Sequence, residues 1–272
     1  MPIDFTAASN EYVTLANESN FDFDRTDAFS ISLWLKTSTA GTLFLFAKEK
    51  TDATFRGYDI RLGTGKIRFF LSSDNSGGPP DRLIVDGTST INDGDWHHVL
   101  ATTDGTGTFA GTAVYIDGVD EATVIDDSLT ATILNDVTPE IGARQALFTY
   151  NGALSDVVVW SSEITPTEAA IICQSRLKFS ALMFQQANVV GYWPMDDQPH
   201  GTATIGDTVR DFFGVNDGTS VNGGTWNAEE ALSYQPHIMT PQSIAAAAPA
   251  AALIAERGPF RGINRGIRRG VA

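Results

Sequence analysis

Apolar and polar residues alternate along much of the first 160 residues, and this period of two is typical of β-strands with one buried face. The segment 29–36 reads Phe-Ser-Ile-Ser-Leu-Trp-Leu-Lys, so every second side chain from Phe29 is apolar. Segments 58–62 and 66–71 alternate in the same way around Gly63-Thr64-Gly65, which predicts a β-hairpin. Asp117-Gly118 is a second two-residue hairpin turn. The pattern therefore predicts an antiparallel, all-β fold.

One helix is predicted to interrupt the strands. Thr165-Pro166-Thr167-Glu168 combines an N-cap threonine, a proline in the first turn and a glutamate that can return a hydrogen bond to the cap. An Ala/Ile/Leu-rich segment follows, so we expect a helix from Pro166 to about Phe184 that packs on the strands. Segments 189–196 and 209–221 predict further strands, and we expect residues 188–226 to complete the fold.

The composition supports a large core joined by many turns. Of the 272 residues, 42% are hydrophobic and 10% aromatic, which is enough to exclude global disorder. We therefore predict an all-β, two-sheet antiparallel jelly-roll sandwich over residues 1–235, with one helix. Large aromatic groups suit the wide gap between two sheets. We expect four tryptophans to lie there, namely Trp34, Trp96, Trp160 and Trp193.

Residues 236–272 differ in character from the rest of the chain. Residues 245–252 are nearly all alanine around Pro249, which blocks a continuous helix. From Arg257 onward an Arg-Gly pair recurs every four residues, and the glycines oppose helix formation. We predict an extended arm that binds neighbouring subunits, with nucleic acid or a membrane as alternative partners. Its contact residues are Arg257, Phe260, Arg261, Ile263, Arg265, Ile267, Arg268 and Arg269.

The formal net charge of −15 is unevenly distributed. Five Arg and one Glu give residues 241–272 a charge of +4, so the remaining residues carry −19. An acidic body repels nucleic acid, so we expect no nucleic-acid binding by the body. The first residues lack the basic and apolar regions of a signal peptide, and no apolar stretch approaches the length of a membrane span. We expect synthesis in a host cytoplasm and no membrane partner.

Patterns that carry catalysis are missing from the sequence. Glycoside hydrolysis needs two carboxylates across a cleft, and jelly-roll glucanases supply them from a closely spaced cluster on one strand. The acids here form adjacent pairs such as Asp120-Glu121, whose side chains diverge on a strand. Neither a Ser/His/Asp pattern nor a Gly-rich phosphate loop is present. His97 and His98 are adjacent, so they point to opposite faces and are poorly placed to share a metal. We expect no enzymatic activity.

Four motifs resemble those of the laminin-G-like and pentraxin-like domains, which are concanavalin A-like jelly rolls. They are Phe29-Ser-Ile-Ser-Leu-Trp-Leu-Lys36, Asp95-Trp-His-His-Val99 with Val114-Tyr-Ile-Asp-Gly118, Tyr150-Asn-Gly-Ala-Leu-Ser-Asp156 with Val158-Val-Trp160, and Val190-Gly-Tyr-Trp-Pro-Met-Asp196 with Asn216-Asp-Gly-Thr219. The resemblance covers roughly residues 3–226 and implies a jelly-roll fold. In this family the last motif more usually precedes the other three, so the C-terminal part is expected to complete the sandwich.

The resemblance also implies possible ligands, because relatives of this kind often bind calcium or sugars. Calcium needs six to eight oxygens gathered from loops. The candidate calcium ligands are Asp22, Asp24, Asp27, Asp196, Asp211 and Asp217. A sugar site needs an exposed aromatic ring beside polar groups, and the candidate residues are Phe148, Tyr150 and Asn151. No cofactor besides a structural calcium ion is expected.

Two functions are consistent with these features. The first is a structural protein of a virus particle, such as a bacteriophage capsid decoration or tail-associated protein, which would reside in the virion. Its acidic body and basic arm suit binding to other virion subunits and to copies of itself. The alternative is a carbohydrate-binding, lectin-like module whose partners are glycans. A jelly-roll fold does not decide between them, because the scaffold hosts many functions.

Overall fold

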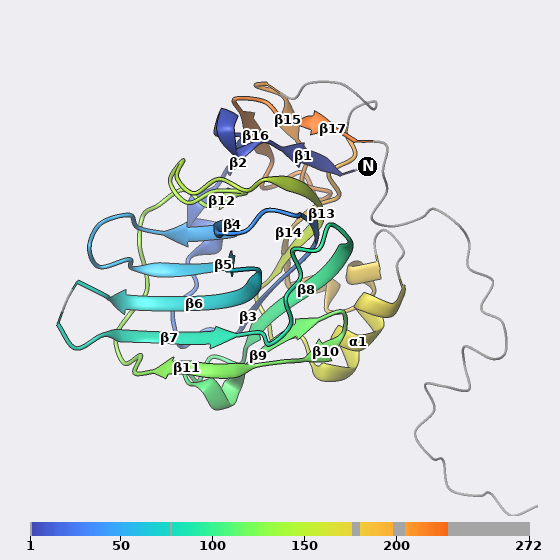
Figure 1. The fold of residues 1–272 in the computed structure, drawn as a ribbon. Coiled ribbons are helices and arrows are strands. Elements are labelled where there is room, and N and C mark those ends of the chain that lie inside the picture. The colour runs from blue at the N-terminus through green and yellow to red at the C-terminus, as the bar shows by residue number, and fades with distance from the viewer. Residues whose placement is uncertain (1, 77, 176–179, 198–204, 228–272) are drawn as a thin grey trace, which may run out of the picture. The chain divides into compact units, whose positions relative to one another are not determined.

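The computed structural model describes residues 2–76, 78–175, 180–197 and 205–227. The chain divides into one unit of Met1–Tyr234 and a second of Gln235–Ala272. The predicted arm and its contact residues from Arg257 to Arg269 lie outside the described residues. The first unit is built from two antiparallel sheets (Figure 1), as the alternation predicts.

Sheet A has eight strands and contains the segment that begins at Phe29. Its strands in spatial order are β10 (Val119–Asp120), β9 (Thr112–Ile116), β8 (Trp96–Thr103), β3 (Phe29–Lys36), β13 (Gly152–Trp160), β1 (Ile3–Phe5) and β17 (Thr225–Trp226), and β14 (Val189–Trp193) also pairs with β13. Strands β9 and β10 form the hairpin that turns at Asp117-Gly118. Asp117 has a φ of 50° and Gly118 one of 81°, the left-handed values that this turn demands.

Sheet B has nine strands and presents the face that carries the candidate site. Its strands in spatial order are β11 (Thr123–Asp127), β7 (Asp81–Asp86), β6 (Lys66–Asp74), β5 (Gly57–Gly63), β4 (Thr42–Glu49), β12 (Glu140–Ile141), β2 (Tyr12–Leu15), β16 (Gly218–Val221) and β15 (Thr208–Val209). The predicted hairpin is β5–β6, in which Gly63 pairs with Lys66. Strands β4 to β7 are the longest of the sheet and form a continuous platform.

The C-terminal part of this unit adds strands to both sheets. In sheet A, β14 pairs with β13 and β17 pairs with β1. In sheet B, β16 pairs with β2 and is extended by β15. The segment that resembles an N-terminal piece of related domains therefore occupies sheet positions beside the true N-terminal strands.

The main core fills the gap between the sheets. Inward-facing positions alternate along each strand, so Ile31, Leu33 and Leu35 of β3 meet Ile60 and Leu62 of β5 in one apolar cluster. Of the tryptophans expected in this gap, only Trp193 lies there, and Trp226 joins it. Trp34 was expected there too, but it falls on an even position of β3 and packs against His98 on the other face of sheet A. Trp96 is partly exposed at the start of β8.

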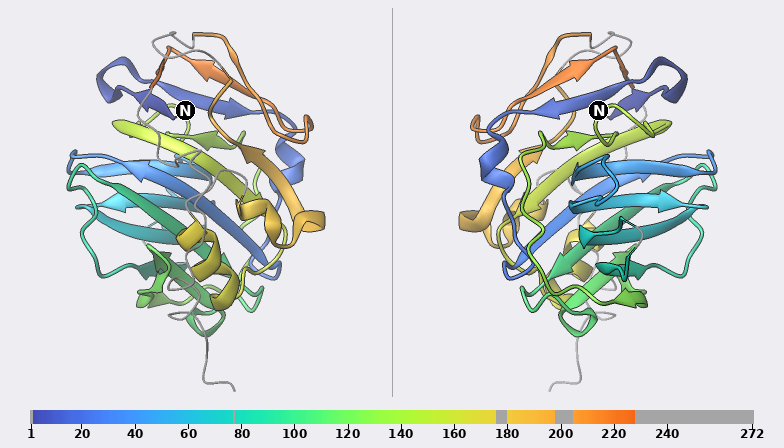
Figure 2. Two further views of the ribbon diagram at one scale, coloured as in Figure 1. Left: turned by 90° about the vertical axis from the view of Figure 1, so that its right-hand side faces the viewer. Right: turned by 90° about the vertical axis from the view of Figure 1, so that its left-hand side faces the viewer.

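A smaller core covers the outer face of sheet A. It contains Trp160, which was also expected between the sheets, together with Leu100, Tyr115 and Ile172. Ile172 belongs to α1 (Pro166–Ser175), which lies over sheet A in Figure 2. α1 and residues 181–189 therefore cover the outer face of sheet A. The outer face of sheet B is on the opposite side of the sandwich.

The predicted helix is correct at its start but too long at its end. Thr165 accepts a hydrogen bond on Oγ1 from the Glu168 backbone N–H, and Glu168 Oε2 accepts the Thr165 N–H at 2.8 Å, which completes the capping box. The α-helix ends at Ser175, and residues 180–183 form a 3-10 helix instead of continuing to Phe184. The short helices are η1 (Ala7–Ser9), η2 (Glu18–Phe21), η3 (Phe109–Gly111), η4 (Ser180–Met183) and η5 (Gln186–Asn188). No helix among the described residues is long and apolar enough to span a membrane.

Candidate functional site

The N-terminal calcium candidates serve the loops in which they stand. Asp22 forms an ion pair with Lys48 at 2.8 Å. Asp24 accepts the backbone N–H groups of Arg25 and Ile133, and Asp27 accepts that of Asp24. These contacts hold the residues before β3 against the 129–137 segment, so the carboxylates act as structural acceptors.

The C-terminal calcium candidates behave in the same way. The buried carboxylate of Asp211 accepts backbone N–H groups from four residues, Tyr192, Phe213, Val215 and Asn216. Asp217 in turn accepts the backbone N–H of Asp211 at 2.9 Å. Asp196 lies just after β14. Within the described part of the chain, no three His, Cys, Asp or Glu side chains are grouped as a metal site. The predicted calcium ligands are therefore not brought together.

The three predicted sugar-contact residues are separated by the structure. Phe148 is 53% exposed, and its ring lies 6.0 Å from that of Phe44. Tyr150 is fully buried, and its hydroxyl donates to the carbonyl of Lys36 at 3.0 Å, so it cannot contact a surface ligand in this arrangement. Asn151 is half-buried, and its amide binds the Ala7 backbone N–H and the Thr39 hydroxyl. Only Phe148 is available to a sugar.

A serine–histidine pair lies on the outer face of sheet A, but no described carboxylate completes it. His98 Nε2 is 2.8 Å from Ser32 Oγ, and His98 Nδ1 is buried without a hydrogen-bond partner. The nearby acid Asp156 instead contacts the hydroxyls of Tyr192 and Ser155. His97 extends toward Asp93 and Asp117, away from His98, as the strand alternation predicts. The pair therefore belongs to the packing of this face.

The outer face of sheet B carries an unusual layer of arginine and phenylalanine side chains. The Arg61 guanidinium lies 5.1 Å from the ring centroid of Phe44 and 4.5 Å from that of Phe70. The Arg144 guanidinium is within 4.7–5.2 Å of three rings, those of Phe44, Phe55 and Phe148. Cation–π contacts of this kind fix the orientation of a guanidinium. The two arginines are thus held in place over the strands.

Two buried acids lie beneath these arginines. Glu49 on β4 accepts a hydrogen bond on Oε1 from Arg144 at 3.0 Å, and Asp59 on β5 is 3.4 Å from Arg61. Burial, reinforced by the charge of Asp59, raises the pKa of Glu49, and burial likewise raises the pKa of Asp59. Glu49 Oε2 and both Asp59 oxygens receive no N–H or O–H group from the described residues. Burial therefore favours the protonated, neutral forms of these acids.

A pocket of about 180 Å³ opens above this layer, and we call it the arginine pocket. Its lining residues are Glu49, Phe55, Arg61, Arg68, Phe70, Asn75, Arg82, Ile84 and Arg144. Phe70 and Ile84 are buried side chains that form an apolar part of the wall. Arg68 is fixed by a two-pronged contact with Asp86, and Arg82 by contacts with Asp126 and Asn75.

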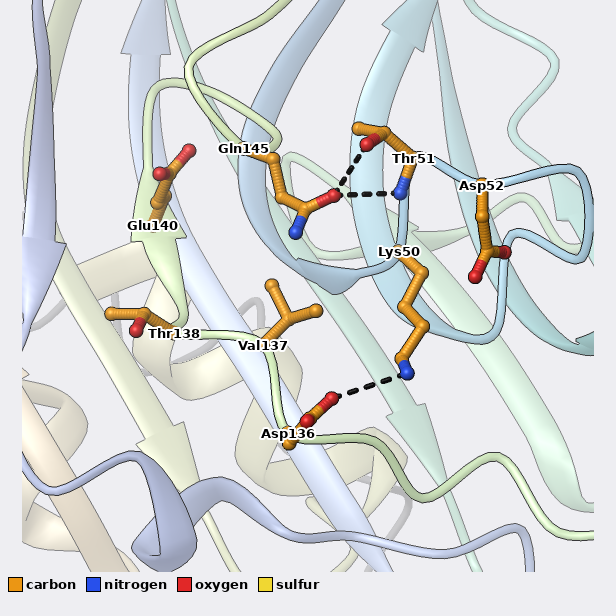
Figure 3. Close-up of a pocket in the computed structure, with 8 residues that line it drawn as sticks. All are labelled: Lys50, Thr51, Asp52, Asp136, Val137, Thr138, Glu140 and Gln145. Atoms are coloured by element: carbon orange, nitrogen blue, oxygen red, sulfur yellow. Dashed lines mark hydrogen bonds and ion pairs between the residues drawn. The ribbon is translucent and has the colours of Figure 1, made fainter.

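A larger hollow of about 630 Å³ is lined by the loop after β4 and by the 136–145 segment, and we call it the polar hollow (Figure 3). Its lining residues are Lys50, Thr51, Asp52, Asp136, Val137, Thr138, Glu140 and Gln145. Lys50 pairs with Asp136 at 3.1 Å, and this contact lowers the pKa of Asp136. The Gln145 side-chain oxygen accepts both the Thr51 backbone N–H at 2.7 Å and its hydroxyl. This leaves the amide N–H groups of Gln145 free of hydrogen bonds to described residues.

Strained backbone surrounds both cavities. Gln145, Ala146 and Phe148 have positive φ values of 45°, 60° and 52°, and Phe55 has one of 47°. Such angles are costly for residues other than glycine and are concentrated at ligand sites in many proteins. The turn 144–148 contributes Gln145 to the polar hollow and Arg144 to the arginine pocket, so its shape positions both. The candidate site is therefore one surface with two adjoining cavities.

A third hollow, of about 550 Å³, lies at a different place on the first unit. It is lined by η5, the start of β14 and the loop that Asp211 organises, including the exposed side chains of Phe213 and Val215. Its wall is more apolar than that of the polar hollow, and most of its polar groups already form hydrogen bonds within the protein. Asn20, for example, donates a hydrogen bond to Asn216 at 2.8 Å. It is the less suitable of the two regions for a hydroxyl-rich ligand.

None of the residues that line the arginine pocket was predicted from the sequence as a site residue. Arg61, Arg68 and Phe70 occupy the outward positions of strands whose inward positions predict the core. That alternation identifies them as outward-facing, but a charged outward residue is usually solvated. Their role depends on the register, which places Arg61 beside both Phe44 and Arg68.

Three solved structures illustrate the likeness of this fold to known proteins. One is a Bacteroides ovatus protein described provisionally as carbohydrate-binding, which is 16% identical to this chain with a TM-score of 0.53. The match covers 80% of this chain and 57% of the Bacteroides protein. The binding domain of Paraclostridial Mosquitocidal Protein 1 is also 16% identical, with a TM-score of 0.46 over 61% of this chain and 41% of its own. A pentraxin of Limulus polyphemus is 17% identical, with a TM-score of 0.39 over 60% of this chain and 81% of its own. At these identities the likeness shows the fold alone.

Sequence comparison places the chain in a family. No curated protein sequence matches it. Residues 7–170, however, match the family model of the concanavalin A-like lectin/glucanases superfamily to which laminin-G domains belong. This match spans more than half of the chain, and it includes the strands β3 to β9 that carry the first two motifs. The chain belongs to the concanavalin A-like lectin/glucanases superfamily.

Proposed function

We propose that the protein is a non-catalytic carbohydrate-binding module and that saccharides bind on the outer face of sheet B. The observation that carries this proposal is the polar hollow, whose wall offers hydroxyl, carboxylate, amide and ammonium groups. The exposed Phe148 belongs to the same 144–148 turn as Gln145 of the hollow. Membership of a superfamily that includes lectins supports the same conclusion, as does the fold likeness to the Bacteroides ovatus protein.

The chemistry of the hollow suits vicinal hydroxyl groups. A sugar hydroxyl both donates and accepts, so a good site offers both kinds of partner at fixed positions. Gln145 is held by Thr51 through its oxygen, so its N–H groups point with a defined orientation. Asp52 is exposed, and its hydrogen bonds with Thr54 lower the pKa of its carboxyl, so it is an acceptor at neutral pH. The strained turn preorganises these groups and reduces the entropic cost of binding.

Screening on a glycan array, followed by calorimetry with the best saccharide, tests the proposal. Gln145→Ala removes the oriented amide, and we expect a loss of affinity of about tenfold, equivalent to about 1.4 kcal/mol. Gln174→Ala is the matched control, because Gln174 is an exposed glutamine of α1 on the opposite side of the sandwich. Absence of saccharide binding in the unmodified protein would refute the function, and equal losses in both variants would refute the site.

A structural role in a virus particle is a second candidate, favoured by the regular basic sequence of residues 257–269. Such an arm can form charge-assisted hydrogen bonds along an acidic neighbour. Sugar binding has the stronger support, since it has a site among the described residues. Deleting residues 241–272 distinguishes the two: glycan binding should be retained, whereas a subunit anchored by the arm would no longer assemble.

A further inference from the structure

The arginine pocket presents cationic groups that are not exhausted by their internal contacts. Arg68 and Arg82 each use two nitrogens on neighbouring oxygens, and each guanidinium has a third nitrogen. Arg61 is 13% exposed and has only distant acid contacts, at 3.4 and 3.9 Å. The Nε atom of Arg144 is buried and has no hydrogen-bond partner among the described residues. Four arginine side chains therefore line a cavity whose wall contains a single acid, Glu49.

The charges around the pocket favour an anion even though the chain as a whole is acidic. Four guanidinium groups face four acids, which are Glu49, Asp59, Asp86 and Asp126. Four arginines but only one acid line the pocket itself. Burial raises the pKa of both Glu49 and Asp59, which favours the neutral forms of these acids and reduces the negative charge beneath the arginines. An anionic group that enters the pocket compensates for the positive charge that remains.

The dimensions restrict the ligand to a small oxyanion on a larger molecule. A volume of 180 Å³ corresponds to about six water molecules at their volume in the liquid, enough for an acid group and part of a sugar ring. Guanidinium groups match the two oxygens of a carboxylate or the oxygens of a sulfate.

We propose that the arginine pocket binds the carboxylate or sulfate group of an acidic saccharide. This inference rests on the proposed function, since the neighbouring sugar unit would occupy the polar hollow on the other side of the 144–148 turn. A neutral saccharide would bind the hollow alone and more weakly. The protein would thus select acidic over neutral glycans.

Calorimetry with three probes tests the inference: trigalacturonic acid, a chondroitin sulfate tetrasaccharide and neutral cellotriose. We expect one acidic probe to bind at least tenfold more tightly than cellotriose in 50 mM salt, and the tighter of the two identifies the preferred acid group. Arg82→Gln, at the rim of the pocket, should remove this preference while leaving cellotriose binding unchanged. Arg68→Gln is the second variant, and retained melting temperature establishes that each is folded. Arg210→Gln changes the net charge equally at an exposed position outside the pocket and should have no effect.

The outcomes separate this inference from the proposed function. If cellotriose and the acidic probes bind equally, or if Arg210→Gln lowers acidic binding as much as Arg82→Gln, the arginine pocket is not the acid site although sugar binding stands. If no probe binds, and no glycan on an array does, both proposals fail. If the folded Arg82→Gln and Arg68→Gln proteins keep the preference, the arginine layer only stabilises sheet B.

Discussion

Glu49 and Asp59 are buried acids on adjacent strands of sheet B, and Arg144 donates a hydrogen bond to Glu49 at 3.0 Å. A single carboxylate at this depth is costly, and two ionised ones repel each other strongly. Arg61 and Arg144 above them supply compensating positive charge, and burial raises the pKa of both acids, which favours their neutral forms. This arrangement links the packing of the sheet to the electrostatic character of its surface.

Glu49→Gln should make stability less dependent on pH. Burial and the charge of Asp59 raise the pKa of Glu49 to about 10. A folded-state pKa above the unfolded one contributes stability that is complete below about pH 4.5 and is lost as pH rises toward 10, by up to about 1.4 kcal/mol per pH unit. Glutamine mimics the protonated acid, so urea unfolding between pH 6 and 9 should show a smaller slope.

The control for this experiment is Glu163→Gln, which alters an exposed glutamate and should leave the pH slope unchanged. If the slope for Glu49→Gln equals that of the unmodified protein, the pKa of Glu49 is not raised in the folded state. The charge excess ascribed to the arginine pocket would then lose its basis.

His98 should destabilise the fold at acidic pH. Burial lowers the pKa of His98 to about 4, whereas an unfolded histidine titrates near 6.5. The contribution of neutral His98 to stability is therefore complete above pH 6.5 and falls as pH drops toward 4, by about 3 kcal/mol in total.

For its neighbour His97, burial alone lowers the pKa, but the hydrogen bond and charge of Asp117 outweigh this and raise it. NMR titration of both imidazoles checks the opposite shifts; similar values for the two would contradict the assigned environments.

Phe148→Ala should weaken saccharide binding more than folding. The ring is 53% exposed and packs on Phe44 and Arg144, so its removal should cost less than about 1 kcal/mol of stability. Loss of its contact with a sugar should reduce affinity by about tenfold. Leu147→Ala is the control, since Leu147 is an exposed neighbour in the same turn. Equal affinities of the two variants would remove Phe148 from the site.

Thr165→Ala should destabilise the start of α1. Its hydroxyl caps the Glu168 backbone N–H, and loss of an N-cap costs about 1 kcal/mol. Thermal unfolding should show a lower melting temperature, whereas Thr167→Ala, at an exposed first-turn position, should not. A similar decrease in both variants would show that the reciprocal cap contributes little.

The sequence predicted the fold well wherever local patterns decide the structure. The alternation in β3 and the turns at Gly63-Thr64-Gly65 and Asp117-Gly118 are local, and each occurs as expected. Two of the four tryptophans, Trp34 and Trp160, were assigned to the wrong face, because an apolar strand does not reveal that both of its faces are covered. Trp34 and Trp160 lie on the side of sheet A away from the main core, and α1 helps to cover that side.

The candidate site was harder to predict because it depends on contacts between distant segments. Arg144 and Glu49 are 95 residues apart in the chain, and only the pairing of β4 with β12 brings their segments together. Phe148 was recognisable as a surface aromatic residue, but Tyr150 and Asn151 beside it turn inward. The predicted calcium ligands are not grouped as a metal site among the described residues, and acids in turns often accept backbone N–H groups, as Asp211 does.

The central claim is that saccharides bind on the outer face of sheet B, and NMR mapping of backbone amides tests it most directly. Titration with a saccharide that binds should shift the amides of residues 50–52 and 136–148, which surround the polar hollow. Amides around the rival hollow, at residues 187–190 and 213–216, should be unaffected. Shifts confined to that rival hollow, or none at all with any saccharide, would contradict the account.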